Sequence, residues 1–597
     1  MPFPLLATTP ISSPLSSKNP LRQPTKSANT RPSPTSLRLP NSTTISCEQK
    51  QVDNNNGSHG IDRRNVLLGL GGLYGATSTM AGKVANAVDG GPVQPPDLSM
   101  CILATDSQAD DEPVNCCPPY STSNIVDFVL PPDAPLRHRK PAHKLSPKEI
   151  ERFKVAIAKM KQLDPKDPWN FMQQATIHCT FCNGAFFQVN YPDKLLQVHA
   201  TWLFAPWHRY YLYFWERILG KLIDDPTFAI PYWNWDVPDG MFIPSFYLDN
   251  SSPLYNDKRN HDHYKALMDF DYKNEPTPTP NPTPDQYKDV INKNLQKVEN
   301  LFNKDNLNKP DLFMGAPVSA GEFVEVRGAL EELHNLAHEW VGPVAKPNHD
   351  MGNFYTAARD TLFWAHHGNV DRLWDFYQKK RMYKPESNLA DYLEASFIFY
   401  DENRQVVKVK VSDCLRAEDL GYTYAPEEFP WQGIRRRNRK EAAEKKKPFK
   451  KQLQLVPVSE FGNQPRPLDD VIRVLVPRPK ISRSKQEKED DVEVLVVDNI
   501  QLDPSSYTKF DVYISKPIAE GLAAPDYGEF AGRYSRIPHI HNKKFPHAGK
   551  AKLQIGITEL LEDINAESAE SLVVTLVPKM GYPSIGRVFI ELQEADY

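Results

Sequence analysis

The segment RDTLFWAHHGNVDRLW, Arg359 to Trp374, decides the fold, because it sets two histidines side by side in an aromatic stretch that favours a helix. Only 16 of the 597 residues are histidine. Neighbouring side chains on a helix point about 100° apart and do not easily bind one ion together. We therefore expect His367 to bind a metal ion, with Asp371 close by on the same face, and His366 to support it from the flank.

A second histidine pair lies upstream, in the sequence ALEELHNLAHEW. His334 and His338 are four residues apart in a stretch of good helix formers, so both imidazoles project from one face and can meet one metal ion. Two unrelated surface histidines would show the same spacing. The pair therefore indicates a metal site only together with the other histidines.

Three further histidines, His178, His199 and His208, lie earlier in the chain. His199 and His208 would point to nearly opposite faces of one straight helix. Pro206 lies between them and is expected to break the run, so that His208 begins a new helix and turns toward the same centre. Six neutral imidazoles without a carboxylate favour copper, whereas dinuclear hydrolytic sites usually include carboxylates.

Composition limits the class of protein. A chain of 597 residues with 40% hydrophobic residues can bury a large core and suggests two or more domains. The formal net charge is -4, so the chain lacks the positive surface that nucleic acid requires. We expect a globular protein with no nucleic-acid partner.

Residues 1–87 are expected to be targeting sequence rather than fold. Residues 1–47 contain no Asp or Glu and are rich in Ser, Thr and Pro, which is typical of a chloroplast transit peptide. Arg63-Arg64 then precedes the apolar run VLLGLGGLYGA and the small-residue site Ala85-Asn86-Ala87, as in a twin-arginine export signal. A membrane anchor is the alternative, but this run is shorter than the roughly 20 residues that span a bilayer. We expect no stable membrane span, use of the twin-arginine export machinery, and a mature protein in the thylakoid lumen.

Five cysteines, Cys101, Cys116, Cys117, Cys179 and Cys182, crowd into the first part of the mature chain. An adjacent pair such as Cys116 and Cys117 does not easily bridge to itself, so each would reach a different partner. A zinc site is the competing use of clustered thiols, but CxxC occurs only at Cys179 and Cys182. Disulfides are favoured, and a lumen tolerates them.

Patterning divides the mature chain into three regions. The first region, residues 88–430, carries helical signals from about residue 140 to 385, such as the capping box Ser146-Pro147-Lys148-Glu149 before an amphipathic run. Residues 431–495 are charge-dense and poor in apolar residues, which predicts an exposed linker that a protease can cut. Residues 496–597 contain short runs rich in Val, Ile and Phe, such as KFDVYIS and SLVVTLVP, which predict a small β-sandwich or jelly roll.

The segments HCTFC, HATWLFAPWHRYYLYFWERILGKL, HNLAHEWVG, MGNFYTAARDTLFWAHHGNVDRLW, DYLEASFIFYDEN and KFDVYI together resemble the plant polyphenol oxidases, the catechol oxidase and tyrosinase family of type 3 copper proteins. The resemblance covers essentially all of the mature chain. It implies a mainly α fold, in which a four-helix-bundle dicopper core domain is followed by a C-terminal β-sandwich (jelly-roll-like) shielding domain.

The resemblance also implies roles for individual residues. Phe354 matches an aromatic gate above the second copper, and a thioether is implied between Cys182 and the ring of His199. The implied disulfides are Cys101–Cys117 and Cys116–Cys179. The implied cofactor is two copper ions, the first held by His178, His199 and His208, the second by His334, His338 and His367.

The implied activity is oxidation of o-diphenols to o-quinones with O2 reduced to water, by a latent proenzyme that an activating protease cuts between about Gly433 and Asp491. Hydroxylation of monophenols would need a proton acceptor, for which the family uses an Asn and a Glu. Asn335 matches the Asn. The usual Glu position holds Leu330, and a one-residue deletion would give the role to Glu331.

Two other classes share parts of this pattern. An oxygen carrier of the hemocyanin type would have the same copper ligands but an obstructed site and a large assembly. A dinuclear zinc hydrolase would contain zinc instead of copper. Within the oxidase class, the phenol could be a simple catechol, a hydroxycinnamate or a lignan or flavonoid precursor.

Overall fold

A computed structural model describes residues 90–106, 112–119, 124–131, 134–273, 283–382, 389–434, 455–461, 464–517, 527–538 and 550–596. The targeting segments expected over residues 1–87, and residues 435–454 of the expected linker, lie outside this described part. Among the described residues, no helix has the length and apolarity to cross a bilayer.

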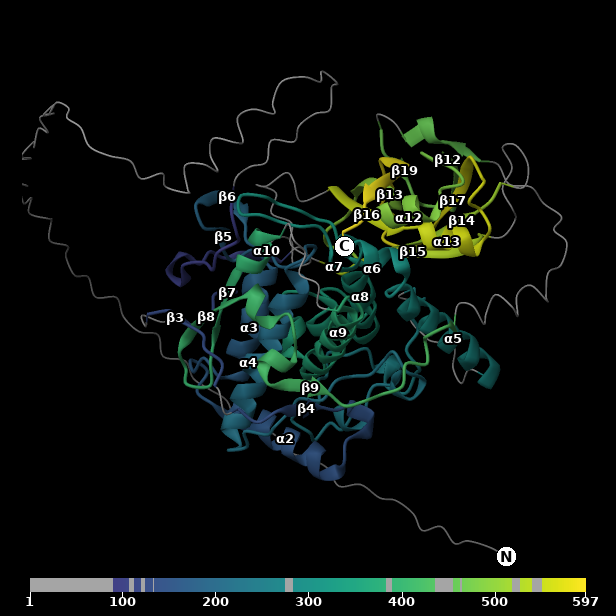
Figure 1. The fold of residues 1–597 in the computed structure, drawn as a ribbon. Helices are drawn as coiled ribbons and strands as arrows, with labels where there is room; N and C mark the ends of the chain where they lie inside the picture. The colour runs from purple at the N-terminus through teal and green to yellow at the C-terminus, as the bar shows by residue number, and fades with distance from the viewer. Residues whose placement is uncertain are drawn as a thin grey trace, which may run out of the picture. The chain divides into compact units, whose positions relative to one another are not determined.

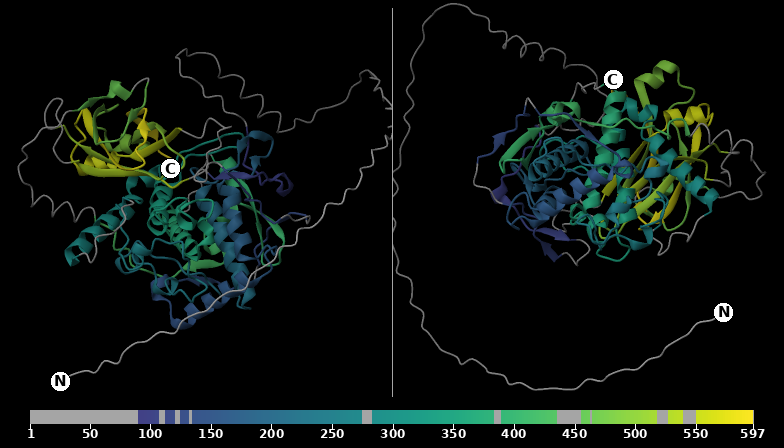
Figure 2. Two further views of the ribbon diagram at one scale, coloured as in Figure 1. Left: turned by 180° about the vertical axis from the view of Figure 1, so that it is seen from behind. Right: turned by 90° about the horizontal axis from the view of Figure 1, so that it is seen from below.

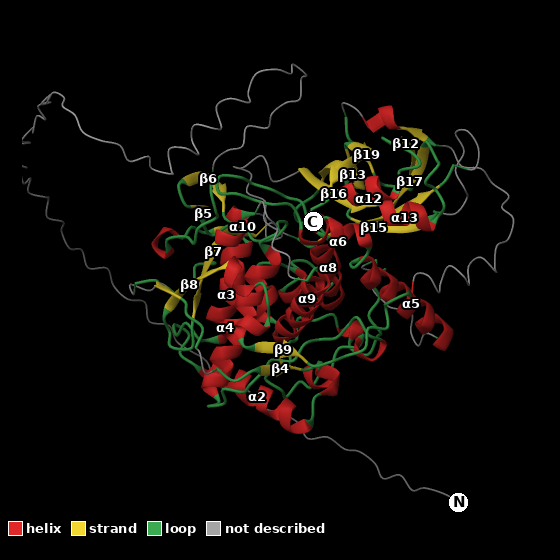
Figure 3. Ribbon diagram, in the orientation of Figure 1, coloured by secondary structure: helices red, strands yellow, loops and turns green. Residues whose placement is uncertain are grey.

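The first large region is mainly helical, as the sequence predicts (Figures 1 and 3). Four of its helices carry all of the candidate histidines except His199, which lies in the turn before α4 (Phe204–Leu222). Small β-sheets of two or three strands lie around them. The helices are α2 (Pro147–Gln162), α3 (Phe171–Cys182), α4 (Phe204–Leu222), α5 (Pro284–Asn300), α6 (Lys304–Asn308), α7 (Pro310–Met314), α8 (Ala329–Val341), α9 (Thr361–Lys380) and α10 (Ala390–Glu394). The strands are β1 (Ala104–Asp106), β2 (Glu112–Val114), β3 (Val126–Asp127), β4 (Arg137–Arg139), β5 (Phe187–Gln188), β6 (Tyr191–Leu195), β7 (Ser396–Tyr400), β8 (Val406–Lys410) and β9 (Tyr422–Tyr424).

Local sequence explains where the helices begin. The predicted capping box is present at the start of α2, where Ser146 and Glu149 satisfy each other's backbone N–H groups. Gly328 precedes α8, and a Cβ there would lie 2.2 Å from the carbonyl oxygen of Phe313. The expectation that Pro206 breaks the chain before His208 is wrong. Helix α4 already begins at Phe204, and Pro206 is tolerated in its first turn, where an N–H has no helical partner.

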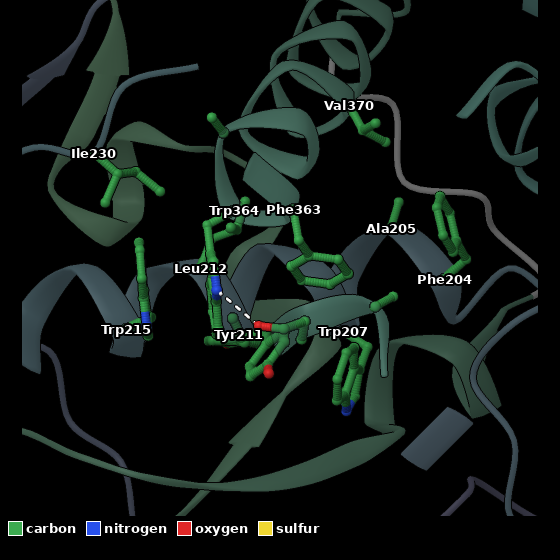
Figure 4. Close-up of a cluster of buried hydrophobic side chains, with 14 of the residues drawn as sticks. Phe204, Ala205, Trp207, Tyr211, Leu212, Trp215, Ile230, Phe363, Trp364 and Val370 are labelled. Atoms are coloured by element: carbon green, nitrogen blue, oxygen red, sulfur yellow. Dashed lines mark hydrogen bonds between the residues drawn. The ribbon is translucent and has the colours of Figure 1, made fainter. Parts of the chain in front are cut away.

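Aromatic side chains fill the space between α4 and α9. The rings of Trp215 and Trp364 stack with centroids 4.0 Å apart, and Tyr211 lies 4.5 Å from Trp364 (Figure 4). Phe363 also projects from α9 toward this cluster. Such pairs stabilise by about 0.5–1.5 kcal/mol beyond the burial of their area. The packing fixes the two helices at the level of His208 and His367.

A buried ionic cluster beside β4 and β9 holds the same two helices together. Asp371 on α9 accepts hydrogen bonds from Arg209 Nε at 2.6 Å, Arg139 at 3.2 Å and Tyr422 at 2.6 Å, and from Tyr424. Burial opposes ionisation, but Arg209 and Arg139 outweigh it, so the pKa of Asp371 is lowered. The expectation that Asp371 stands beside the metal with His367 is therefore wrong, because its carboxylate points away toward β4 and β9.

The second region is a β-sandwich, as predicted (Figure 2). One sheet has the order β10-β12-β17-β14-β15, and the other has the order β11-β18-β13-β16 with β19 also paired to β13. Their facing side chains, such as Val512 and Leu495, share one hydrophobic core. The strands and helices are β10 (Val456–Pro457), β11 (Arg466–Pro467), β12 (Ile472–Pro477), α12 (Lys485–Asp490), β13 (Asp491–Gln501), β14 (Thr508–Ser515), β15 (Glu529–Arg536), β16 (Lys550–Gly556), α13 (Thr558–Asp563), β17 (Ser571–Met580), β18 (Ser584–Ile585) and β19 (Arg587–Glu594).

The predicted boundary between linker and C-terminal domain needs correction. Strand β12, Ile472–Pro477, pairs with β17 along its whole length, and three of its side chains are buried. The domain therefore begins by about residue 456 rather than 496. The prediction failed because short strands with Arg and Lys on their solvent-facing sides have the same charged composition as an exposed linker. The expected cleavage range, from about Gly433 to Asp491, thus overlaps the first strands of this domain, and residues 435–454 of that range lie outside the described part.

We predict that Asp371→Asn destabilises the full-length protein by about 3–5 kcal/mol, because the buried guanidinium of Arg209 loses its nearest counter-charge and that of Arg139 keeps only Glu216. The free energy of unfolding in urea measures this. Asp127→Asn is the control, since Asp127 pairs with Lys408 on the surface, and it should leave stability unchanged. Equal stability of the two variants would show that the cluster does not hold α4 and α9 together.

Candidate metal centre

The first group of donor side chains comes from α3, α4 and the turn before α4. It consists of His178, Cys182, His199 and His208, whose ligand atoms all lie within 4.8 Å of one another. All four residues are buried. The sequence prediction that these three histidines converge is confirmed. Because α3 carries both His178 and Cys182 one turn apart, the thiol reaches the same centre.

The second group comes from α8 and α9 and consists of His334, His338, His366 and His367. The Nε2 atom of His334 lies 2.9 Å from Nε2 of His338 and 3.2 Å from Nε2 of His367, and the last two are 3.4 Å apart. Three ring nitrogens of three different side chains thus face one point. The i, i+4 pair on α8 shares one face, as predicted.

The two groups face each other across the bundle. The rings of His208 and His367 are parallel, with centroids 4.3 Å apart. His199 and His334 also approach, with centroids 6.3 Å apart. Two ions bound by these groups would be immediate neighbours, so the arrangement is a dinuclear site.

Backbone carbonyls decide which ring nitrogen points inward. Nδ1 of His178 lies 3.1 Å from the carbonyl oxygen of Phe354, Nδ1 of His208 lies 2.8 Å from that of Phe204, and Nδ1 of His338 lies 2.8 Å from that of Met351. A neutral imidazole that donates from Nδ1 presents a lone pair at Nε2. Nε2 of His178 and Nε2 of His208 accept no hydrogen bond within the described part of the chain, so their lone pairs are available to a bound cation.

Electrostatics supports the same protonation state. Burial is the main cause that lowers the pKa of His208 to about 3 and that of His338 to about 4. Burial and the neighbouring imidazoles also lower the pKa values of His178, His334 and His367 far below the ordinary range. The rings are therefore neutral at physiological pH, which is the state that binds a metal.

The adjacent histidines His366 and His367 have different hydrogen-bond environments. Trp235 donates from Nε1 to Nδ1 of His366 at 3.1 Å, so the lone pair on that nitrogen is already used. Nε2 of His367 faces the other histidines instead. Sequence reasoning missed Trp235. Its segment, IPYWNWDVP, contains two tryptophans but no periodic pattern that would place either one against α9.

The cysteines form the two implied disulfides, Cys101–Cys117 and Cys116–Cys179. The second ties the N-terminal segment to α3, one residue after His178. Cys182 belongs to neither disulfide and lies in the first donor group. A zinc site is thus not the use of these thiols.

Phe354 lies over the first donor group rather than the second. Its ring is buried, with its centroid 4.4 Å from that of His199 but 6.4 Å from that of His338. The expectation of a gate above the second site is therefore wrong in its placement. The loop from Gly342 to Phe354 folds back across the bundle, which spacing from His367 does not reveal.

The structure does not bring Glu331 and Asn335 together as a hydrogen-bonded pair. Both carboxylate oxygens of Glu331 accept from the N–H of Ala200, at 2.8 and 3.1 Å. Asn335 instead donates from Nδ2 to the carbonyl oxygen of Ser535 in the β-sandwich, at 2.9 Å. The N–H of Ser535 also donates to the neighbouring Glu332.

The β-sandwich covers the histidine groups on the side of Phe354 and Asn335. Tyr507, Ile537 and Met580 form one buried cluster with Phe354. The hydroxyl of Tyr507 donates to the carbonyl oxygen of Gly352 at 3.0 Å, and Lys509 lies 2.5 Å from the buried Glu339 of α8. Sequence analysis singled out the segment KFDVYI, which starts at Lys509, but could not show what it contacts.

Two adjacent, buried groups of histidine on four helices define a dinuclear copper protein of the tyrosinase type. Three family descriptions match consecutive parts of the chain: the common central domain of tyrosinase over residues 168–380, the polyphenol oxidase middle domain over 388–437, and the chloroplastic polyphenol oxidase C-terminal domain over 464–592. The chain belongs to the plant polyphenol oxidases. It binds two copper ions and oxidises o-diphenols to o-quinones with O2 in the chloroplast.

Individual relatives agree with this assignment. The chloroplastic polyphenol oxidase of Vitis vinifera is 43% identical over 548 residues, covering 89% of this chain and 87% of the relative. The chloroplastic (+)-larreatricin hydroxylase of Larrea tridentata is 41% identical, covering 92% of this chain and 93% of the relative. The structure of a latent aurone synthase (polyphenol oxidase) is similar with a TM-score of 0.74 at 36% identity, covering 85% of this chain and all of the other.

We predict that copper affinity of the folded protein changes little between about pH 7.5 and about pH 5.5. Because burial lowers the pKa values of the histidines in the folded protein, protons compete with copper for them only at about pH 4 or below. For an exposed imidazole, protons compete with copper below about pH 6.5. Titration of the copper-free protein against a competing chelator measures the affinity. The urea-unfolded chain is the control and should lose about tenfold per bound histidine across one pH unit below 6.5. The same loss in the folded protein would contradict the burial argument.

Proposed function

We propose that His178, His199 and His208 hold the first copper and that His334, His338 and His367 hold the second. The observation that supports this most strongly is the convergence of the Nε2 atoms, because three lone pairs within 3.4 Å of one another are favourable only around a cation. His366 is excluded from the set because its Nδ1 accepts from Trp235. Bound copper supplies the electron transfer between phenol and O2.

A thioether between Cys182 and the ring of His199 is part of the proposal. Cys182 lies in the first donor group within 4.8 Å of the histidine nitrogens. Burial raises the pKa of its thiol, so the sulfur is neutral and does not compete as a thiolate ligand. A covalent bond there would restrain His199 without occupying a coordination position.

The buried centre also suggests how the chain treats its substrate. Phe354 forms an aromatic wall against His199, which can pack on the ring of a phenol and exclude water. Oxidation of an o-diphenol needs no additional protein base in this scheme. Hydroxylation of a monophenol would require a proton acceptor directed at the phenol, whereas both oxygens of Glu331 are directed at the N–H of Ala200. We therefore propose diphenol oxidation as the main activity.

We propose that the full-length chain is latent and resides in the thylakoid lumen after twin-arginine export. The cluster of Tyr507, Ile537 and Met580 against Phe354 supports latency, because it covers the wall on which a phenol would pack. Several basic residues make the stretch from residue 435 to 454 a ready target for an activating protease. Latent forms among the relatives fit the same scheme.

We predict that His367→Ala reduces bound copper from two ions to about one per chain, whereas His366→Ala retains both. Elemental analysis of the purified full-length variants measures the ratio. The two substitutions are matched, since they remove the same side chain from neighbouring buried positions. Loss of copper in the His366 variant with retention in the His367 variant would reverse the assignment.

We predict that cleavage in the segment 435–454 with release of the β-sandwich increases O2 uptake with an o-diphenol by at least about tenfold, while the matching monophenol gives little uptake. An oxygen electrode measures both substrates side by side. Unchanged diphenol turnover after cleavage would reject latency. Equal uptake with both substrates would show a full tyrosinase and assign a proton acceptor to this site.

A further inference from the structure

His199 differs from the other five candidate ligands in its backbone. His178, His208, His334, His338 and His367 all lie on helices, whose internal hydrogen bonds fix each Cα position. His199 lies in the turn between β6 and α4. Other groups must therefore fix the peptides on either side of it.

Side chains hold the backbone before and after His199. On the N-terminal side, Oε1 of Gln197 accepts from the N–H groups of Val198 and His199, both at 2.9 Å. On the C-terminal side, the N–H of Ala200 donates to Glu331 Oε2 at 2.8 Å and Oε1 at 3.1 Å. The carbonyl oxygen of Ala200 accepts from the N–H of Val326 at 3.0 Å.

Ala200 needs this support because its backbone is in the left-handed region, with φ of 58°. Residues that carry a Cβ rarely adopt this conformation, and they keep it only when the surroundings impose it. The side chain of Glu331 is fully buried, and both of its carboxyl oxygens lie within hydrogen-bonding distance of the Ala200 N–H. It is therefore well suited to impose the conformation.

The other contacts of Glu331 agree with a holding role. Arg327 Nε lies 3.4 Å from Oε1 of Glu331 and so also restrains the carboxyl group. Asn335, the residue expected to act with Glu331, is bonded to Ser535 instead.

We infer that Glu331 is a positioning residue, which places His199 for the first copper by holding the strained peptide of Ala200. This inference rests on the proposed assignment of His199 to the first copper. It differs from the proton-accepting role that the family resemblance implies for Glu331. His199 is the one candidate ligand outside a helix. The inference explains why both the Glu331 contact with Ala200 and the proposed thioether restrain this residue.

Three substitutions separate the two roles. Glu331→Gln keeps an oxygen that accepts from the Ala200 N–H but removes the group that takes up a proton. Glu331→Ala removes both functions. Ala200→Gly removes the cost of the positive φ, so that the turn no longer depends on the carboxylate.

The experiment uses the full-length, copper-loaded chain and counts copper ions after dialysis against a mild chelator. Mass spectrometry of the peptides that contain Cys182 and His199 gives the yield of the cross-link. We expect Glu331→Gln to keep two coppers and the cross-link. Glu331→Ala should lose first-site copper with about tenfold weaker retention. Ala200→Gly combined with Glu331→Ala should restore both readouts toward those of the unsubstituted chain.

Glu332→Gln is the matched control, because Glu332 is a buried neighbour on α8 that contacts Ser535 rather than Ala200. It should retain both coppers and the cross-link, and circular dichroism shows whether each variant is folded. The positioning role is overturned if Glu331→Ala keeps first-site copper, or if Glu331→Gln loses as much as Glu331→Ala. If the unsubstituted chain itself holds fewer than two coppers, the ligand assignment fails instead.

Discussion

The structure depends on the convergence of neutral imidazole nitrogens in a dry core. Three Nε2 atoms from α8 and α9 lie 2.9–3.4 Å apart, and their lone pairs repel one another unless a cation lies between them. For His334 and His338 a carbonyl oxygen near Nδ1, that of Glu331 and that of Met351, sets the inward direction of the lone pair. The helices must therefore pack so that the Nε2 atoms converge while the Nδ1 atoms still reach their carbonyl acceptors.

A buried ion pair next to the histidines restrains the helices α4 and α9 in this approach. Arg209 follows His208 directly, and Asp371 lies one turn after His367, so one ion pair ties together the two helices that carry stacked histidines. Removing ions from water is costly, and this cluster is favourable only because four donors surround one carboxylate. The ion pair that stabilises the bundle thus also fixes the distance between the helices that carry His208 and His367.

The sequence predicted the parts of this arrangement that follow a helical period. The face shared by His334 and His338, the capping box at Ser146 and the choice of His367 over His366 all depend on local geometry. Prediction failed where a loop or a distant strand decides the contact. Phe354 lies over the first donor group because its loop folds back, and Asp371 turns toward β9 because two tyrosines and two arginines meet it there. Strand β12 was taken for linker because its exposed side chains are charged.

Helix α8 connects the metal centre to the C-terminal domain through two of its faces. His334 and His338 point to the centre, whereas Glu332, Asn335 and Glu339 contact Ser535 or Lys509 of the β-sandwich. The acceptors that orient the candidate ligands, the carbonyls of Phe354, Phe204 and Met351, all belong to the helical region. Loss of the β-sandwich would therefore free the amide of Asn335 and the carbonyl of Gly352 without removing any acceptor that orients a histidine. In the described part of the chain, the hydrogen bonds and ion pairs from the covering domain reach side chains of the ligand helix that are not candidate ligands, so the domain can be released from this centre.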